Sequence, residues 1–370
     1  MKFTAAQSDL SQSLSIAARA VSSRNTLPIL SGILLKTDRN RLQVAATDLE
    51  VALQVVLPAQ IEEEGQIVLP ARYLTEIIRR LPDGPVRVEV DASNYTATFF
   101  WERSHYTIHG QAAEQFPQLL DPAGDTTFHL GQGELRNLIR QTIFAASHDE
   151  TRPILTGACV SIQPGLLEVV ATDGVRIAFR RQSLPEIPDQ AGQRLVIPAR
   201  CLNELLRLLT SAEASPVTVH LAPNQIFFDL DGVTLASRLL EGQYPDVLRL
   251  VPKQYETTMR LSVPAFHDAC ERASLIAREG SNAIKLSLSE GGAVITSNTP
   301  EVGQVYEELA AALEGSPLEI GLNPRFLADG LKVIDADELV FEFSGSRTAS
   351  RMRPAGKEDF FYVVLPIVIW

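Results

Sequence analysis

The chain repeats its own motifs at a nearly constant spacing through its 370 residues. The heptapeptide Thr26–Gly32 returns as Thr151–Gly157, 125 residues later, and an Ala-Thr-Asp triplet follows each copy, ending at Asp48 and at Asp173. A second motif, built around Pro-Ala-Arg, occurs at Ile67–Leu74, at Leu195–Leu202 and, more weakly, at Ile320–Leu327. A period of about 120 residues is far longer than a solenoid repeat of roughly 20 to 50 residues, and it suits an independent domain. The sequence therefore predicts three tandem copies of one domain.

Each copy has the hydrophobic pattern of an α+β domain. Two stretches per copy carry apolar residues at helical spacing, and strands with alternating polar and apolar residues follow them. The expected helices are Ser8–Val21, Ala71–Leu81, Gly133–Ser147, Ala199–Leu209, Pro264–Ala277 and Pro324–Ile334. Turn-forming segments at Asp121–Gly124 and Val251–Gln254 separate the copies, so we place the domains at 1–122, 123–252 and 253–370. With about eight strands per copy, the two helices can cover one face of an antiparallel sheet.

The strands of each copy contain one Asx residue at which the apolar phase changes. Around Asp48 the apolar positions change from even to odd numbers, and Leu49 begins the new strand. Such a switch predicts a tight turn or bulge. Asp173 and Asn298 occupy the matching places in the other copies, and a bond from side chain to backbone explains all three. Asp231-Gly232 is a strong hairpin signal.

The composition is that of a globular protein and contains no targeting or membrane segment. Hydrophobic residues make up 45% and charged residues 21% of the chain. No apolar signal region follows Met1, and no run of about 18 apolar residues occurs, which predicts a cytoplasmic protein without membrane contact. Cys159, Cys201 and Cys270 stand far apart among apolar neighbours, so we expect buried free thiols.

Charge is distributed unevenly between the expected helices and the rest of the chain. The net charge of −12 argues against a nucleic-acid partner, yet the helical segments together are positive. Their basic side chains are Arg19, Arg72, Arg79, Arg80, Arg136, Arg140, Arg200, Arg207, Arg272 and Lys332. They form either ordinary solvated helix faces or, if three copies place their helices on a common side, a surface that attracts phosphate without reading bases.

The residues that could carry catalysis or bind a metal have simpler explanations. Asp48 and Asp173 could act as paired carboxylates, but Asn298 in the third copy shows that the shared role needs no ionisation. His105 and His109 lie on one face of an expected strand, without a third ligand nearby. The chain has no phosphate-binding loop, nucleophile elbow or zinc-protease motif. We therefore expect no catalytic residue, no metal and no cofactor.

Several motifs together resemble the bacterial DNA polymerase III β subunit family, the sliding clamps. They are Thr26-x-Pro-Ile-Leu-x-Gly, Ala-Thr-Asp-Gly-x-Arg at 171–176, Pro-Ala-Arg before two helices, Glu-Gly-Gln-Tyr-Pro-Asp at 241–246 and Tyr-Val-Val-Leu-Pro at 362–366. The resemblance extends over the whole chain. It implies a non-catalytic processivity factor, a head-to-tail homodimeric ring of six domains with pseudo-sixfold symmetry, helices around the hole and sheets outside. The implied partners are double-stranded DNA without sequence preference, the polymerase III α subunit, the clamp loader, and other polymerases and repair proteins that bear short linear motifs.

The resemblance also implies roles for particular residues. Loops that contact DNA would contain Arg24, His148 and Arg152, and the helix cations Arg72, Arg79, Arg80, Arg136, Arg140, Arg200, Arg207 and Lys332 would face the DNA. The dimer contact would join Tyr106 and Ile108 of one subunit to Leu275 and Ile276 of the other, with an ion pair between Arg103 and Glu307. The peptide pocket would contain Leu155, Thr172, Gly174, Val175, Arg176, Ile177, Pro245, Arg249, Leu250, Asn323, Phe326, Leu365, Pro366, Ile367 and Val368.

The chain departs from the family pattern in a few places, and two other functions stay open at this point. Many members have His where Val175 stands, aromatic residues where Pro153 and Ile154 stand, and another ending than Ile369-Trp370. The main alternative to the ring is a monomeric scaffold that binds peptides without encircling DNA. A hydrolase using Asp48 and Asp173 is the third hypothesis.

Overall fold

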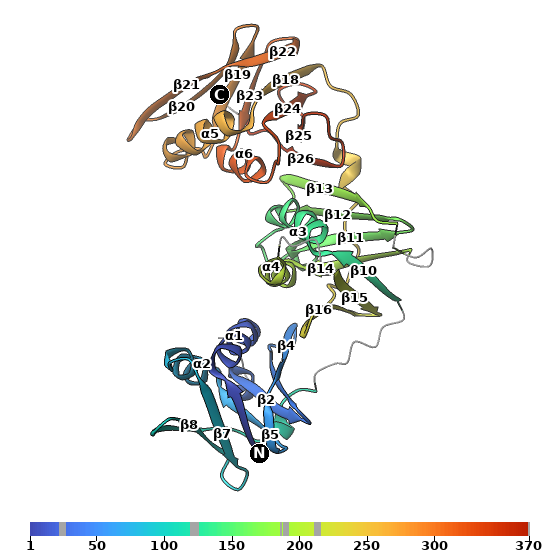
Figure 1. Cartoon of the computed structure of the whole chain (residues 1–370). Helices are drawn as coiled ribbons and strands as arrows, with labels where there is room; N and C mark the ends of the chain where they lie inside the picture. The colour runs from blue at the N-terminus through green and yellow to red at the C-terminus, as the bar shows by residue number, and fades with distance from the viewer. Residues whose placement is uncertain (22–26, 119–125, 186, 188–191, 211–215, 369–370) are drawn as a thin grey trace. The chain divides into compact units, whose positions relative to one another are not determined.

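The computed structural model describes residues 1–21, 27–118, 126–185, 187, 192–210 and 216–368. Contacts divide the chain into two compact units (Figure 1). Unit 1 comprises Met1–Gln132 and Arg207–Leu239, and unit 2 comprises Gly133–Leu206 and Leu240–Trp370. The described residues form six α-helices, two in each predicted copy: α1 Gln7–Ala17, α2 Ala71–Arg80, α3 Gln132–Arg140, α4 Ala199–Leu208, α5 Val263–Ala277 and α6 Pro324–Leu331.

Unit 1 contains two antiparallel sheets. The five-stranded sheet has the order β5-β1-β7-β8-β9, with β1 Lys2–Ala6, β5 Gln60–Glu63, β7 Pro85–Asp91, β8 Thr96–Trp101 and β9 Ser104–His109. The eight-stranded sheet has the order β10-β15-β16-β17-β4-β3-β2-β6, with β2 Gly32–Asp38, β3 Arg41–Thr47, β4 Val51–Pro58, β6 Gln66–Pro70, β10 Thr126–Gly131, β15 Pro216–Ala222, β16 Gln225–Leu230 and β17 Val233–Arg238. Short 3-10 helices lie at Ala18–Ala20, Pro28–Ser31 and Ala113–Gln115.

Unit 2 also contains two antiparallel sheets. The nine-stranded sheet has the order β14-β11-β12-β13-β26-β25-β24-β18-β22, with β11 Gly157–Gln163, β12 Leu166–Thr172, β13 Arg176–Ser183, β14 Gln193–Pro198, β18 Thr257–Ser262, β22 Ala311–Gly315, β24 Glu338–Phe343, β25 Ser350–Pro354 and β26 Phe360–Val364. The four-stranded sheet has the order β21-β20-β19-β23, with β19 Ile284–Ser289, β20 Gly292–Thr299, β21 Gly303–Leu309 and β23 Leu318–Leu322. Its 3-10 helices are Ile143–Ala145, Pro153–Thr156 and Val247–Leu250.

The helices form as their apolar spacing predicts, and they pack against sheet and against each other. In unit 1, α1 contacts α2, β3 and β4. Leu10 and Leu14 of α1 and Leu74 and Ile78 of α2 are fully buried, each pair being four residues apart and hence on one helix face. Burying each such side chain stabilises the fold by about 1.5–3 kcal/mol. In unit 2, α5 contacts α6 and β20 in the same manner.

Two strand pairings join predicted copies that are distant in the sequence. In unit 1, β4 of the first copy pairs with β17 of the second, with Ala52 opposite Ala236. In unit 2, β13 of the second copy pairs with β26 of the third, with Ile177 opposite Val363. We call the β4–β17 pairing the first junction and the β13–β26 pairing the second junction. The predicted three-copy α+β arrangement is thus confirmed, and each junction makes one continuous sheet from two copies.

Two of the predicted local features are confirmed. Asp231 (φ 41°) and Gly232 (φ 88°) form the two-residue turn between β16 and β17. Cys159, Cys201 and Cys270 are buried and, among the described residues, are not joined in disulfides, and burial raises the pKa of the Cys270 thiol. Apolar surroundings stabilise the neutral thiol over the thiolate.

Helix α3 is shorter than predicted. It ends at Arg140 instead of reaching Ser147, and the 3-10 turn Ile143–Ala145 follows. Thr142 has φ −123° and ψ −46°, and its hydroxyl donates to the Leu138 carbonyl at 2.7 Å. A β-branched residue whose hydroxyl takes the carbonyl four residues earlier competes with continued helix, and the next residue is β-branched as well.

The phase switch in the strands also differs from the prediction in two places. Leu49 does not begin a strand: its φ is 80°, its side chain is 43% exposed, and β4 starts at Val51. In the third copy, Asn298 lies inside β20 opposite Gln304, so the prediction of an Asx turn at this residue is wrong. Strand β20 continues to Thr299, whose carbonyl accepts from the backbone of Val302 at 3.2 Å and closes the hairpin there.

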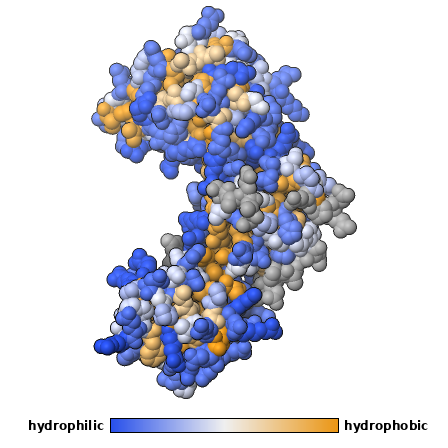
Figure 2. Space-filling view, viewed as in Figure 1, coloured by the Kyte–Doolittle hydropathy of each residue, from blue (hydrophilic) through white to orange (hydrophobic). Residues whose placement is uncertain are grey.

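Figure 2 shows that the visible face is mainly hydrophilic, with hydrophobic residues gathered in separate patches. Among the described residues, no helix is both long and apolar enough to cross a membrane.

Candidate functional sites

The turn between β12 and β13 is held by its own side chains. The hydroxyl of Thr172 accepts from the backbone N–H of Gly174 at 3.0 Å and donates to the carbonyl of Arg176 at 2.6 Å. Oδ1 of Asp173 accepts from the backbone N–H groups of Val175 at 2.9 Å and of Arg176 at 3.1 Å. Gly174 has φ 97°, a conformation that glycine adopts without steric cost. The sequence Thr-Asp-Gly therefore specifies this turn locally.

The turn between β3 and β4 makes the same four bonds. The Thr47 hydroxyl accepts from Leu49 at 3.0 Å and donates to the Val51 carbonyl at 2.9 Å. Oδ1 of Asp48 accepts from the backbone of Glu50 at 3.1 Å and of Val51 at 2.9 Å. In both copies the aspartate is a turn acceptor, so the predicted bond from side chain to backbone is confirmed for these two residues.

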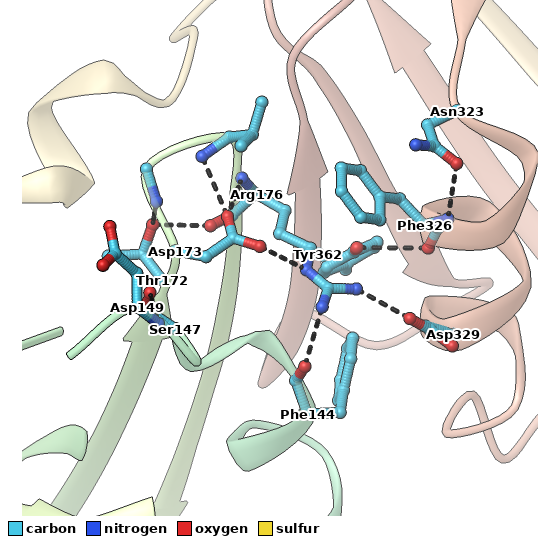
Figure 3. A network of polar contacts seen from close by, with 12 residues as sticks. Phe144, Ser147, Asp149, Thr172, Asp173, Arg176, Asn323, Phe326, Asp329 and Tyr362 are labelled. Atoms are coloured by element: carbon cyan, nitrogen blue, oxygen red, sulfur yellow. Dashed lines mark hydrogen bonds and ion pairs between the residues drawn. The ribbon is translucent and has the colours of Figure 1, made fainter. Parts of the chain in front are cut away.

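Arg176 is buried beside the second junction and is held by groups from both copies that meet there (Figure 3). Its Nε lies 2.8 Å from Oδ2 of Asp173 and its Nη1 lies 2.8 Å from Oδ2 of Asp329, while Nη2 donates to the Phe144 carbonyl at 3.1 Å. The guanidinium carbon stands 4.4 Å from the centroid of the Phe326 ring, a cation–π contact. Burial lowers the pKa of Arg176, but the neighbouring Tyr362 together with the carboxylates of Asp329 and Asp173 outweighs it, and the net shift of this pKa is upward.

The sequence interpretation placed Arg176 among the residues of the peptide pocket, and the structure shows how its side chain is held there. Only 7% of its surface is exposed, and all three of its guanidinium nitrogens have partners in the chain. A buried cation must be paired to persist in the ionised form. Arg176 therefore fixes the walls of the site, and its charge is not available to a ligand.

An apolar cluster lies directly beside this network. It comprises Leu155, Cys159, Val170, Ile177, Phe179, Val196, Tyr244, Val247, Ala349 and Val363. The Tyr244 hydroxyl accepts from the backbone N–H of Thr172 at 3.1 Å, which ties the cluster to the turn, and burial raises the pKa of this phenol. Leu155, Ile177 and Thr172 are each less than a tenth exposed, so they form the floor beneath the site.

The exposed part of the site consists of aliphatic side chains from three segments. Val175, Leu250, Leu365 and Val368 are 44%, 67%, 40% and 66% exposed. The backbone N–H of Leu365 donates to the Val175 carbonyl at 3.0 Å, so the C-terminal segment lies against the turn. Leu250 is therefore not part of the core. Contiguous exposed aliphatic groups are typical of a protein-binding surface.

The remaining predicted pocket residues border this surface or support it. Asn323 caps α6, since its side chain accepts from the backbone of Arg325 at 3.0 Å and of Phe326 at 3.4 Å. Arg249 and Pro245 are exposed, and Arg249 pairs with Asp246. The backbone of Ile367 donates to the Gly321 carbonyl at 2.8 Å, which holds the segment that carries Pro366.

The predicted DNA-facing cations are mostly exposed, and several have carboxylate partners. Arg79 and Arg80 on α2 both bind Glu76, at 2.8 and 3.1 Å, and hydrogen bonds from Arg79 and Arg80 lower the pKa of that carboxyl. Lys332 lies 2.8 Å from Glu271, and Arg140 pairs with Asp335. Exposed pairs of this kind are weak and exchange readily with other anions. Arg72, Arg200, Arg207, His148 and Arg152 are exposed, Arg136 is half-buried, and Arg24 lies outside the described residues.

The predicted dimer residues lie on the end strands β9 and β21, on helix α5 and in the β8–β9 turn. β9 ends the five-stranded sheet and β21 ends the four-stranded sheet. Tyr106 on β9 is 42% exposed, Leu275 on α5 is 54% exposed and Arg103 in the β8–β9 turn is exposed, whereas Ile108 is buried within its own unit and Ile276 is half-buried. Glu307 binds Arg272 of the same chain through two bonds of 2.6 and 2.9 Å, and the Arg272 hydrogen bond lowers the Glu307 pKa.

His105 and His109 are exposed on β9, and the ring of His109 lies 3.3 Å from the Thr96 hydroxyl. No cluster of three possible metal ligands occurs among the described residues.

Sequence reasoning missed the partners of Arg176. Asp329 lies on the solvent side of a helix pattern, and Phe144 contributes only its backbone carbonyl. Glu76 and Glu204 stand at the place of Asp329 in the other copies, so a carboxylate at this position did not mark a partner of Arg176. Tyr244 carried a visible signal, because it stands in the motif Glu-Gly-Gln-Tyr-Pro-Asp at 241–246.

Comparison with known proteins finds one and the same family along the whole chain. Family models match at residues 1–120, 129–246 and 248–368, described as the N-terminal, central and C-terminal domains of the DNA polymerase III beta subunit. A beta sliding clamp of Staphylococcus aureus is 34% identical over 377 residues, covering 99% of each chain. A DNA polymerase sliding clamp from Bacillus subtilis superimposes with a TM-score of 0.96 at 34% identity, and a DNA polymerase III subunit beta from Pseudomonas aeruginosa with 0.94 at 32%, each over 100% of both chains.

Proposed function

The chain belongs to the bacterial DNA polymerase III β subunit family, the DNA sliding clamps, and from this premise we propose that two copies close head to tail around duplex DNA. The family are processivity factors without catalytic activity of their own, so the hydrolase hypothesis is wrong. DNA and polymerase are partners that membership implies. The homodimer, the clamp loader and the other polymerases and repair proteins that bind by short motifs belong to our proposal, as does a cytoplasmic location.

The strand pairing at the two junctions carries the proposal of a ring. Strands β4 and β13 are third in their three-stranded meanders, and each pairs with the last strand of the following copy, β17 or β26. In the third copy β21 has the place of β4 and β13, because it pairs with β20. In the first copy β9 has the place of β17 and β26, because it pairs with β8. Strands β9 and β21 both end their sheets. If the pairing seen at the two junctions also occurs between chains, β21 of one chain pairs with β9 of a second chain. A heterologous contact that closes after two steps gives a ring.

The first junction also supplies a register for this intermolecular contact. Thr299 faces Gly303 across the β20–β21 turn, as Thr47 faces Ala52 across the β3–β4 turn. Strands β9 and β17 each begin after a two-residue turn, at Ser104 and at Val233. Counting from these first residues, Thr107 corresponds to Ala236. Since Ala52 faces Ala236, we expect Thr107 of one chain to face Gly303 of the other, which places Tyr106 opposite Gln304. Pairing the two edges would also remove two exposed strand edges that otherwise favour aggregation.

The helix cations supply the contact with DNA in this proposal. Arg72, Arg79, Arg80, Arg200 and Arg207 are exposed on α2 and α4. On α2, Arg79 and Arg80 pair with the solvent-accessible carboxylate of Glu76, and phosphate can replace this carboxylate at little cost. A ring retains DNA by topology, so weak and sequence-independent phosphate contacts suffice, and they permit sliding.

We propose that the aliphatic surface at the second junction takes the linear motifs of partner proteins. Val175, Leu250, Leu365 and Val368 present apolar side chains above a rigid floor, and Arg176 locks that floor through its ion pairs. Such an arrangement suits an extended peptide with aliphatic or aromatic anchors, while a few exposed polar groups such as Arg249 set its direction.

The ring is tested by placing a charge in the expected interface and by cross-linking. Leu275→Asp should convert a species near twice 40.5 kDa into a monomer in sedimentation, because an unpaired carboxylate would be buried. Tyr106→Cys together with Gln304→Cys should give a covalent dimer under oxidation, and neither single variant should. The natural cysteines are buried and do not compete. A wild-type chain that sediments as a monomer at micromolar concentration would favour the scaffold.

Topological retention is tested on circular DNA. Clamp loaded on nicked circles should leave when the DNA is cut, and clamp that stays equally bound to open ends would contradict encirclement. The peptide surface is tested separately with the probe Ac-Ser-Leu-Ser-Leu-Phe-amide. Val175→Glu should abolish its binding and leave the dimer intact, whereas Leu275→Asp should do the reverse, so each variant serves as the control for the other.

A further inference from the structure

A cavity of about 210 Å³ lies at the first junction, inside unit 1. Its floor is the sheet surface where β4 and β17 pair, at Ala52 and Ala236. The β3–β4 turn with Leu49 and the segment with Pro117 also line the cavity. The cavity is smaller than the roughly 300–1,000 Å³ of pockets for small molecules. Its size suits one side chain of a larger ligand.

This cavity occupies the place that the proposed peptide surface occupies at the second junction. The β3–β4 turn at the first junction and the β12–β13 turn at the second make the same four hydrogen bonds, with Leu49 in the place of Gly174. Phe116-Pro117 in the first copy corresponds to Tyr244-Pro245 in the second, and both aromatic rings are buried. The two sites are therefore built from equivalent parts of successive copies.

The cavity is open because small residues replace large ones on its floor. At the second junction Ile177 faces Val363, and both are buried in the apolar cluster. At the first junction the same positions are Ala52 and Ala236, and both remain partly exposed. The missing side-chain volume leaves a hollow over the paired strands where the second junction has packed core.

Leu49 gives a second, independent reason to regard the cavity as a binding site. Its φ is 80° and its side chain is 43% exposed, facing the cavity. A bulky residue in the left-handed region is strained, and glycine stands at the equivalent position of the second copy. Backbone strain that persists at a ligand-facing position points to a function for the side chain there.

Apart from Val51, the rest of the lining is polar and differs from the aliphatic second junction. Three amide side chains, Gln54, Gln118 and Gln225, border the cavity, and Glu50 and Arg238 place one charge of each sign at its rim. Amides can both donate to and accept from a peptide backbone. The lining thus offers a small apolar centre inside a ring of hydrogen-bonding groups.

We propose that the first junction is a second peptide-binding site, which takes an extended segment with one aliphatic side chain flanked by amide or hydroxyl side chains. The aliphatic group lies on Ala52 and Ala236 between Leu49 and Pro117. The amides of Gln54 and Gln225 bond the flanking residues. That the ligand is a peptide rests on the function proposed for the second junction, whereas the position of the site rests on the cavity itself.

The test uses two fluorescently labelled probes on the full-length wild-type protein. Probe A is Ac-Gln-Ser-Leu-Ser-Gln-amide, and probe B is Ac-Ser-Leu-Ser-Leu-Phe-amide for the second junction. Probe A should bind with a dissociation constant of about 1 mM or tighter, as expected for one anchor with a few hydrogen bonds. Ala236→Leu should fill the floor and weaken probe A at least roughly tenfold, which corresponds to 1.4 kcal/mol. Ala236→Leu and Leu49→Gly should both leave the affinity for probe B unchanged.

Leu49→Gly separates binding from folding. It removes the apolar wall and relieves the strained backbone, so the protein should melt at the same or a higher temperature while probe A is lost. Probe A that binds Leu49→Gly or Ala236→Leu as it binds wild type overturns the proposal, as does no binding of probe A at millimolar concentration. Loss of probe A in Val175→Glu also overturns it, because binding then belongs to the second junction. If probe A binds as expected and probe B does not, the first-junction site stands and the proposed function of the second junction fails.

Discussion

The first and second junctions share one backbone design and differ in nearly every side chain that covers it. Both pair the third strand of one copy with the last strand of the next, and both close the adjacent turn with the same threonine and aspartate bonds. At the second junction the turn leads into Arg176, buried with two carboxylates, but at the first it leads into Val51, buried in plain core. The repeated domain fixes the geometry, and the side chains grafted on it decide which site results.

The largest effect that separates the junctions should come from Arg176→Met. The change keeps the volume but leaves Asp173 and Asp329 facing each other without a cation. Breaking a buried ion pair costs 3–5 kcal/mol, and the partial exposure of Asp329 brings the expected loss to about 3 kcal/mol. Urea unfolding measures it.

Asp329→Asn in the Arg176→Met background is the control for this prediction. Because it removes one of the uncompensated charges, the double variant should be more stable than the sum of the two single effects. Strictly additive losses, or a loss under about 1 kcal/mol for Arg176→Met, would show that the network does not hold the second junction together.

Acid should weaken unit 2 through Glu342, a buried carboxylate on β24 of the nine-stranded sheet. Burial raises the pKa of Glu342, but hydrogen bonds from Arg351 and Arg353 outweigh it and hold that pKa below the usual 4.5. A lowered folded-state pKa means stability that is present above pH 4.5 and lost as pH falls through the folded value. Glu342→Gln should cost about 2 kcal/mol at pH 7.

The pH dependence of the melting temperature checks this prediction. The gap between wild type and Glu342→Gln should be constant from pH 7 to about pH 5.5 and should narrow below pH 4.5, where protonation removes the advantage of the carboxylate. A gap of constant size down to pH 3 would mean that the variant acts through packing and not through charge.

A smaller difference between the junctions lies in one hydroxyl group. Tyr244 accepts the backbone N–H of Thr172, whereas Phe116 at the matching place of the first copy has no hydroxyl. Tyr244→Phe should therefore destabilise the protein by about 1 kcal/mol, since a buried N–H loses its acceptor. It should also weaken probes at the second junction only. Phe116→Tyr is the reciprocal variant, and stability gained there would show that the first turn can use the same bond.

The repeat architecture could be predicted from the sequence because it rests on local signals that recur. Two-residue turn chemistry at Asp231-Gly232, helical spacing after Pro-Ala-Arg and the Thr-Asp turns all act within a few residues. The sequence did not predict the structure where two local conformations differ little in free energy. Thr142 ends α3 by bonding its own helix, and the hairpin of the third copy turns after Thr299 instead of at Asn298.

The candidate site was harder to predict than the fold because its decisive contacts are distant in the sequence. Arg176 was named, but its role changed once Asp329, 153 residues away, was seen to hold it. The cavity at the first junction depends on Ala52 and Ala236 facing each other, a register that neither strand pattern specifies by itself. Small residues in a strand carry little signal, although here they determine where the surface is hollow.

The smallest expected effect concerns the helix cations, and it tests whether they act through DNA or through the fold. Glu76 is bound by Arg79 and Arg80 on the exposed face of α2, so Glu76→Gln should leave the melting temperature unchanged within error, because screened surface pairs contribute little. Two guanidinium groups are then free for phosphate. Direct binding to linear duplex DNA should strengthen at low salt. The plot of log binding constant against log salt concentration should become steeper by up to roughly 0.9, the slope for the release of one further counterion. Arg87 on β7, which pairs with Glu89 on the same strand and with Glu62 on β5, offers a control outside the helices. Glu89→Gln removes one negative charge there, as Glu76→Gln does on α2, and should leave DNA binding unchanged. If both variants strengthen DNA binding equally, the positive charge acts from the whole surface, and the helices have no special part in it.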